Sequence, residues 1–440
     1  MNLRPFHRAA TTALTAVVGV SFAVATASAA SAASAEERPP FYEPPAELPG
    51  GNGDVVRSEP SEYFLDPLKT IPVDADVQRV MYRSTDGDGG PIAVTGTVIT
   101  PKDDWKGDGE RPVIGYAPGT QGMADHCAPS RQLANGTEYE GFFIKAMLSK
   151  GYAVAMTDYE GLGTPGSHTY VNREVTGNAV LDVVRAAQRL PDADVPDDGP
   201  VVLYGYSQGG GGSASAAELA GSYAPELDIK GAAAGAVPAE LGGVGENLDG
   251  SPYAAFLGYA LVGVAAGYDI DLDPYLNDTG KQFREDVENS CTIDGIAKFA
   301  FAKSADYSAD GRPVTDYLDE APFADVVAEQ RIGRTAPDFP VLVSQSRLDD
   351  VIPFEQSKTL ADDWCGAGAD VQFAPNLGPT HIGGAVASFP RAFQWIDDRV
   401  AGKPTEPNCG STDQAPADPE IPVDENQPLL PQLSERMDIH

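Results

Sequence analysis

Short hydrophobic runs alternate with longer amphipathic stretches along most of this chain. Runs of this length between turn residues indicate buried strands, predicted here at residues 77–82, 92–99, 112–117, 152–157, 200–206, 230–237, 340–344 and 370–374. Helical patterns lie between them, at residues 142–150, 174–190, 355–364 and 382–401. This alternation predicts an α/β fold, with a mostly parallel central sheet and helices on both faces.

One long segment interrupts the alternation. Residues 239–336 lie between two predicted sheet strands, so we expect them to form an inserted helical cap or lid. Within the insertion, residues 251–268 are uncharged, apolar and rich in glycine. A membrane span needs about 20 apolar residues, so this stretch predicts a buried cap helix. The alternative is a hydrophobic lid that faces lipid when it opens.

The ends of the chain follow neither pattern. Residues 1–35 combine a basic start, an apolar run and several small-residue cleavage sites between Ala29 and Ala35, as in a secretory signal peptide. Residues 36–75 predict an extended N-terminal arm, and the acidic residues 410–440 predict a disordered tail. The α/β core is then assigned to residues 76–238 and 337–409. The mature protein is expected to be extracellular and to have no transmembrane segment.

Charge excludes some partners. The 440 residues include 30 Lys+Arg and 65 Asp+Glu, a formal net charge of −35. Nucleic acids and anionic membranes are bound by clustered basic side chains, so neither is an expected partner. We interpret the acidity as a solubility feature of an exported protein.

Residues 205–209 read Gly-Tyr-Ser-Gln-Gly and match the pattern G-x-S-x-G. A buried strand is predicted directly before them, and small residues that open a helix follow directly after. This is the strand–turn–helix context that the pattern requires, because the tight turn presents the serine hydroxyl at the edge of the sheet. The sequence therefore predicts that Ser207 is a nucleophile.

A serine nucleophile needs a base, and in this kind of site the chain order is serine, acid, histidine. His126 and His168 precede Ser207, and His440 ends the acidic tail. His381 is left, in a loop between the last predicted strand and the last predicted helix. Elimination therefore favours His381 as the general base.

The acid is expected in the loop after the predicted strand at residues 340–344. Asp349 and Asp350 both lie there, and either carboxylate could orient an imidazole. Asp349 is favoured and Asp350 is the alternative. The one that is not used is expected to cap the following turn.

A site of this kind also needs donors for the oxyanion. The backbone N–H of Gln208, the residue after the nucleophile, is one expected donor. The second is expected from the loop after an earlier strand, which residues 117–122 (Ala-Pro-Gly-Thr-Gln-Gly) provide. We assign it to Thr120 or Gln121.

The chain contains four cysteines, Cys127, Cys291, Cys365 and Cys409. In an exported protein they are expected to form two disulfides. Four cysteines permit three pairings, and the sequence by itself does not select among them.

Several of these segments occur together in a specific combination. The chain resembles the secretory lipase family of actinobacteria and fungi, within the α/β-hydrolase superfamily. The resemblance covers most of the mature chain and rests on residues 41–45, 118–122, 127–130, 158–163 and 205–210 and on the segments around Asp349 and His381. It departs from many relatives at Pro118, where they carry histidine.

The resemblance implies a triad of Ser207, Asp349 and His381 and a cap inserted after the sixth strand. It also implies the disulfides Cys127–Cys291 and Cys365–Cys409, and the hydrolysis of triacylglycerols or simpler esters.

The predicted function is a secreted serine hydrolase that cleaves carboxylic esters, with triacylglycerols as the favoured substrate. The expected partners are a lipid or small ester and, through the cap, a lipid interface. We expect a monomer that needs no cofactor or metal. A short-chain carboxylesterase or an acyltransferase on the same fold is the first alternative. A catalytically silent, hydrolase-like binding protein is the second.

Overall fold

The computed structural model describes residues 38–412 with the exception of residue 192. The predicted signal peptide, residues 1–35, lies outside the described residues, as does the predicted acidic tail from residue 413 onward. Within the described residues, no helix is both long enough and apolar enough to cross a membrane.

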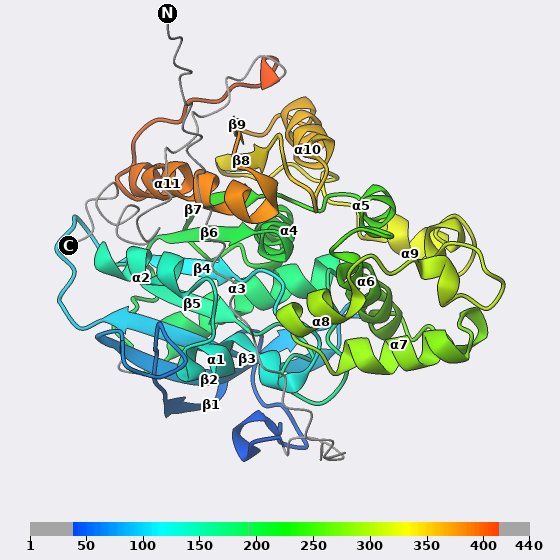
Figure 1. Ribbon diagram of the computed structural model, residues 1–440. Coiled ribbons are helices and arrows are strands. Elements are labelled where there is room, and N and C mark those ends of the chain that lie inside the picture. The colour runs from blue at the N-terminus through cyan, green and yellow to red at the C-terminus, as the bar shows by residue number, and fades with distance from the viewer. Residues whose placement is uncertain (1–37, 192, 413–440) are drawn as a thin grey trace, which may run out of the picture. The chain divides into compact units, whose positions relative to one another are not determined.

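Nine strands form one sheet in the order β1-β2-β3-β5-β4-β6-β7-β8-β9 (Figure 1). The pairings from β1 to β5 in this order are antiparallel, and those from β5 to β9 are parallel. The strands are β1 (Val55–Pro60), β2 (Ala75–Thr85), β3 (Pro91–Pro101), β4 (Val113–Ala117), β5 (Ala153–Thr157), β6 (Val201–Tyr206), β7 (Ile229–Gly235), β8 (Val341–Ser346) and β9 (Val371–Asn376).

Helices cover both faces of this sheet. Apolar side chains of α3, α4 and α10 form one core with the sheet, and those of α1, α2 and α11 form another. A sheet buried on both faces explains why its parallel strands are continuous hydrophobic runs. The core helices are α1 (Pro129–Asn135), α2 (Gly141–Ser149), α3 (Arg173–Arg189), α4 (Gln208–Tyr223), α10 (Phe354–Gly366) and α11 (Thr380–Val400).

The predicted strands and helices are all present, with ends that differ from the prediction by a few residues. The strand β1 was not predicted, because it lies inside the segment interpreted as an extended arm, residues 36–75. Its residues Arg57, Ser58 and Glu59 are polar, and it ends at Pro60. An edge strand tolerates both features, since one side of its backbone has no partner strand.

The predicted insertion is a group of helices between β7 and β8, at the right of Figure 1. It follows the sixth predicted strand, which is the seventh strand of the structure because of β1. The cap helices are α5 (Leu241–Leu248), α6 (Ala254–Gly267), α7 (Asp278–Glu288), α8 (Thr292–Phe299) and α9 (Phe323–Glu329). Short 3₁₀ helices are η1 (Pro40–Tyr42) and η2 (Asp125–Cys127) in the core segments and η3 (Asp273–Tyr275), η4 (Ser304–Asp306) and η5 (Val314–Tyr317) in the cap.

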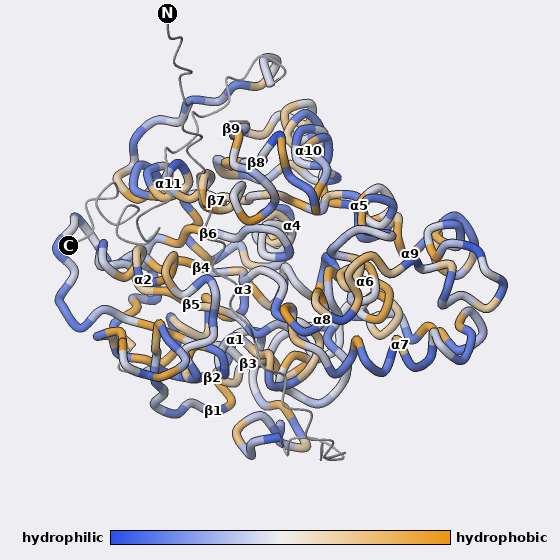
Figure 2. Tube along the Cα trace, in the orientation of Figure 1, coloured by the Kyte–Doolittle hydropathy of each residue, from blue (hydrophilic) through white to orange (hydrophobic). Residues whose placement is uncertain are grey.

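The apolar stretch at residues 251–268 forms α6, and most of this helix is buried. Its side chains pack with those of α5, α7 and α8 into a third hydrophobic core. In Figure 2 it is coloured mainly white to orange, whereas α7 shows long hydrophilic stretches in blue. The structure therefore agrees with the prediction of a buried cap helix.

Candidate active site

Ser207 lies at the sharp turn between β6 and α4. Its backbone angles, φ 63° and ψ −125°, are ones that non-glycine residues rarely adopt. The turn is crowded: a Cβ atom on Gly205 would lie 2.0 Å from the carbonyl oxygen of Gly209, and one on Gly209 would lie 2.0 Å from that of Ala117. Glycine is therefore required on both sides of the serine, and the serine is held in a strained position at the end of the sheet.

His381 and Asp349 are hydrogen-bonded through their side chains. The Nδ1 atom of His381 lies 2.9 Å and 2.8 Å from the two carboxylate oxygens of Asp349. The Asp349 side chain is fully buried. Its Oδ1 accepts the N–H groups of Val351 and Ile352, and its Oδ2 accepts the side-chain amide of Gln345. These donors fix the carboxylate and compensate its burial.

Asp350, the alternative acid, contacts the same histidine at a different atom. Its Oδ1 accepts the backbone N–H of His381 at 2.8 Å. Asp349 therefore orients the imidazole ring, while Asp350 holds the first turn of α11.

The residue before the nucleophile links Ser207 to the histidine. The Tyr206 hydroxyl donates to the carbonyl oxygen of His381 at 2.9 Å, and the two rings lie 5.1 Å apart between centroids. Asp349 thus contacts the ring of His381, and Tyr206, the chain neighbour of Ser207, contacts the backbone of His381, although these residues come from separate segments of the chain.

The predicted oxyanion donors lie on either side of the nucleophile turn. Gln208 is the first residue of α4, so its backbone N–H is one of those that have no acceptor within the helix. In the loop after β4, the N–H of Gly119 is already bonded to the carboxylate of Glu140. Within residues 38–412, the backbone N–H groups of Thr120 and Gln121 donate to no protein acceptor. Either N–H could therefore serve as the second donor, and the assignment to Thr120 or Gln121 stays a prediction.

His168, which chain order excluded as the base, lies beside this site. Its Nδ1 is 2.8 Å from the carbonyl oxygen of Glu160, which requires a proton on Nδ1. Its Nε2 is therefore the acceptor for the side-chain amide of Gln208, at 3.1 Å. Burial lowers the pKa of His168 to about 4, so the ring is neutral. The sequence carries no signal for this contact, because the two residues lie on different elements.

Acidification is expected to destabilise the fold through His168. The pKa of this group falls from 6.5 to about 4 on folding. The contribution of the neutral ring to the free energy of unfolding is therefore fully present above pH 6.5 and is lost as the pH falls toward 4. The loss amounts to about 3 kcal/mol. In urea unfolding, His168→Gln should therefore be less stable than the parent at pH 7, with a difference that shrinks toward pH 4.5. A difference independent of pH would contradict this. His126→Gln is the control at an exposed histidine.

An apolar pocket adjoins Ser207. Ser207 and Gln208 form part of its wall, together with Tyr170 and the aliphatic loop after Asp350. The cap supplies the remainder of the wall through α5 and α6, with the side chains Leu241, Val244, Leu248, Phe256, Leu257 and Ala260.

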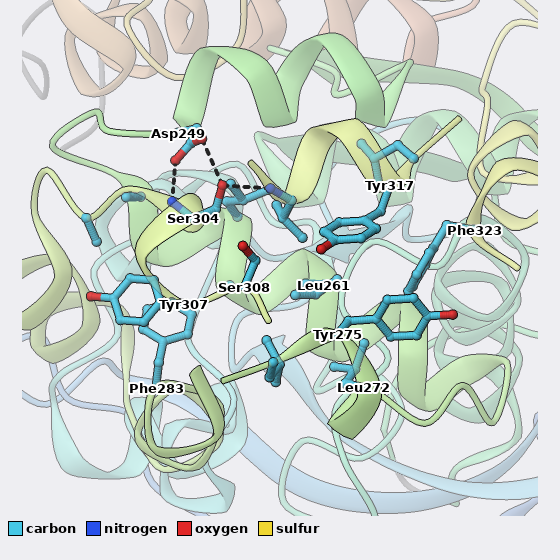
Figure 3. A pocket seen from close by; sticks show the side chains of 17 residues that line it. Asp249, Leu261, Leu272, Tyr275, Phe283, Ser304, Tyr307, Ser308, Tyr317 and Phe323 are labelled. Atoms are coloured by element: carbon cyan, nitrogen blue, oxygen red, sulfur yellow. Dashed lines mark hydrogen bonds between the residues drawn. The ribbon is translucent and has the colours of Figure 1, made fainter. Parts of the chain in front are cut away.

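A second apolar pocket lies within the cap (Figure 3). Leu257 of α6 lines both pockets. The polar groups at one edge bond to one another: Asp249 accepts the backbone N–H and the hydroxyl of Ser304, whose oxygen in turn accepts the N–H of Val314. Apart from Ser308, the remaining wall is aliphatic and aromatic and includes Leu261, Leu272, Tyr275, Phe283, Tyr317 and Phe323.

The four cysteines form the two disulfides that the resemblance implies. Cys127 is bonded to Cys291, and Cys365 to Cys409. The first pair joins the segment after the oxyanion loop to the cap, and the second joins the end of α10 to the start of the tail. His126 lies close to the first pair, but sulfurs in a disulfide are not thiolate ligands, so this group does not form a metal site.

Comparison with known proteins identifies the family. The sequence pattern that describes the secretory lipase family matches residues 128–408. A Mycobacterium tuberculosis protein named as a probable inactive lipase is 32% identical over 376 residues, which cover 83% of this chain and 82% of that protein. A secreted triacylglycerol lipase of Malassezia globosa is 30% identical over 390 residues, 84% of this chain and 82% of that protein.

Solved structures share the fold. Candida antarctica lipase A in its closed state superimposes with a TM-score of 0.77 at 23% identity, covering 92% of this chain and 96% of that one. A mutant of the rice cell wall degrading esterase LipA from Xanthomonas oryzae gives 0.66 at 20% identity, covering 81% and 100%. The predicted α/β-hydrolase fold is thus confirmed, and the chain belongs to the secretory lipase family.

Proposed function

We propose that this chain is a secreted serine hydrolase that cleaves carboxylic esters, above all triacylglycerols, through an acyl-enzyme on Ser207. The observation that carries the proposal is the His381–Asp349 hydrogen bond next to the strained Ser207 turn. A nucleophile, a base and an oriented acid are the three groups that acyl transfer through serine requires.

The reaction proceeds in two steps. The Ser207 hydroxyl attacks the ester carbonyl, and His381 takes its proton at Nε2 while Asp349 stabilises the imidazolium. The N–H of Gln208 and an N–H of the loop after β4 stabilise the oxyanion. Collapse expels the alcohol, which receives the proton from His381. Water, deprotonated by the same histidine, then attacks the acyl-enzyme and releases the carboxylic acid.

The apolar pockets support a lipid as the substrate. The pocket next to Ser207 is lined by aliphatic and aromatic side chains of α5 and α6, and the cap pocket continues this lining beyond Leu257. Burying one CH₂ group contributes about 0.8 kcal/mol, so long acyl chains gain more here than short ones. Rates on p-nitrophenyl esters of increasing acyl length, and on emulsified triacylglycerol, separate this proposal from a short-chain carboxylesterase.

A catalytically silent protein is the second candidate, because one relative is named as an inactive lipase. The sequence of this chain keeps serine, aspartate and histidine in the order that catalysis needs.

A fluorophosphonate probe separates the two candidates. We expect one probe molecule to attach covalently per chain, at the peptide that contains Ser207, and no labelling of Ser207→Ala. A parent protein that takes up no probe, or takes it up elsewhere, would refute the proposed mechanism.

Secretion is part of the proposal. It is supported by the signal-like residues 1–35, by the two disulfides, and by the secreted relative from Malassezia globosa. N-terminal sequencing of the exported protein should find a start shortly after one of the small residues between Ala29 and Ala35.

A further inference from the structure

The oxyanion loop is bonded to three consecutive residues that precede α2. Glu140 accepts the N–H of Gly119 at 2.8 Å. The Tyr139 hydroxyl donates to the carbonyl oxygen of Thr120 at 3.0 Å. Glu138 accepts the side-chain amide of Gln121 at 3.2 Å. Residues 119, 120 and 121 are bonded in turn to residues 140, 139 and 138, so the two segments run in opposite directions. We call residues 138–140 the clasp.

The bond from Tyr139 fixes the peptide unit that carries the Gln121 N–H, one of the two candidates for the second oxyanion donor. In a trans peptide unit the C=O and the following N–H point in opposite directions. The Thr120 carbonyl oxygen is held by Tyr139 and also by the Thr292 hydroxyl, at 2.6 Å. Because the Gln121 N–H shares that peptide unit, it must point away from both hydroxyls.

The peptide unit between Pro118 and Gly119, two units earlier, is held at both ends. The Gly119 N–H is bonded to Glu140, and the Pro118 carbonyl oxygen on the opposite side accepts the Tyr159 hydroxyl at 2.9 Å. The Pro118–Gly119 and Thr120–Gln121 peptide units, on either side of the unit that carries the Thr120 N–H, are thus oriented before any substrate binds. Such preorganisation is what gives an oxyanion hole its effect, since no reorganisation is needed as charge develops.

We propose that Tyr139 and Glu140 are positioning residues of the oxyanion hole, which act on the transition state through the backbone of residues 119–121. The inference rests on the proposed function, because it assigns a role within the same reaction. Neither residue touches the reacting atoms.

The protonation state of the clasp fits this role. Burial, followed by the nearby carboxyl of Glu138, raises the pKa of Glu140 well above its ordinary value. A raised pKa favours the uncharged form of Glu140, which can still accept the Gly119 N–H through its carboxyl oxygen. A glutamine has the same shape and the same accepting oxygen, so it should substitute for this acid.

Tyr139→Phe is the sharpest test. The tyrosine is 55% exposed, so loss of its hydroxyl leaves the core intact. We expect kcat to fall about 10-fold with KM and Tm unchanged, because one bond that orients the oxyanion loop is lost. Tyr268→Phe is the matched control: its hydroxyl bonds to Glu329 and Gln330 in the cap, away from the loop, and its kcat should equal that of the parent.

Glu140 variants supply the second measurement. Glu140→Gln should keep kcat within about 3-fold of the parent, whereas Glu140→Met, which lacks an acceptor, should lower it about 100-fold. The second-order rate constant for fluorophosphonate labelling should likewise stay near that of the parent in Glu140→Gln and fall in Glu140→Met. The reason is that the phosphoryl oxygen of the probe occupies the oxyanion hole.

The outcomes are separable. An active parent with kcat unchanged in Tyr139→Phe would overturn the inference and leave the proposed function standing, and so would equal kcat in Glu140→Gln and Glu140→Met. A parent that neither hydrolyses esters nor takes up the probe would overturn both.

Discussion

Ser207→Ala is expected to lower kcat on ester substrates by about 10⁴- to 10⁶-fold, with little change in KM. In the proposed mechanism the hydroxyl is the attacking group, and no other side chain can replace it in a turn where Gly205 and Gly209 leave no room for rearrangement. The loss corresponds to about 5 to 8 kcal/mol of transition-state stabilisation.

Initial rates on p-nitrophenyl esters and on emulsified triacylglycerol provide the measurement. Ser222→Ala, on the exposed side of α4, is the matched control and should retain the parent rate. Circular dichroism and Tm of Ser207→Ala should match the parent. A Ser207→Ala protein that hydrolyses these esters at the parent rate would contradict the assignment of Ser207 as the nucleophile.

The second large expected effect is a loss of kcat that distinguishes Asp349 from its neighbour Asp350. Asp349→Asn should lower kcat about 10⁴-fold, because the amide can no longer hold the imidazole in the tautomer that accepts the serine proton. Asp350→Asn should cost no more than about 10-fold, since the amide oxygen can still accept the backbone N–H of His381.

Initial rates of the two variants and the parent on the same p-nitrophenyl esters provide the measurement. Equal losses of activity in the two variants, or a larger loss in Asp350→Asn, would contradict the assignment of Asp349 as the acid of the triad.

The sequence was sufficient to predict elements whose hydrophobic pattern is strong. The central strands are buried on both faces, so their residues form clear apolar runs, whereas β1 is an edge strand with polar residues and was taken for irregular chain. Ser207 and His381 could be proposed because local chain order and the small number of histidines restrict the choice.

The remaining features depend on the direction of side chains in space. Asp349 and Asp350 are adjacent in sequence, and only the course of the loop decides which carboxylate reaches the ring of His381. The clasp joins Gly119 to Glu140 between separate loops. Hydrophobic periodicity carries no information about such contacts, because they involve single polar atoms in irregular backbone.

The Cys127–Cys291 disulfide limits how the cap can move. Besides its two chain ends, the cap is covalently attached to the core near its middle, where Thr292 and Ser290 also bond to the backbone of residues 121–123. The cap therefore cannot swing away as a single rigid flap, and any opening is confined to the stretches on either side of Cys291. The same bond means that one proteolytic cut between residues 239 and 290 releases no fragment, since both pieces stay joined until the disulfide is reduced.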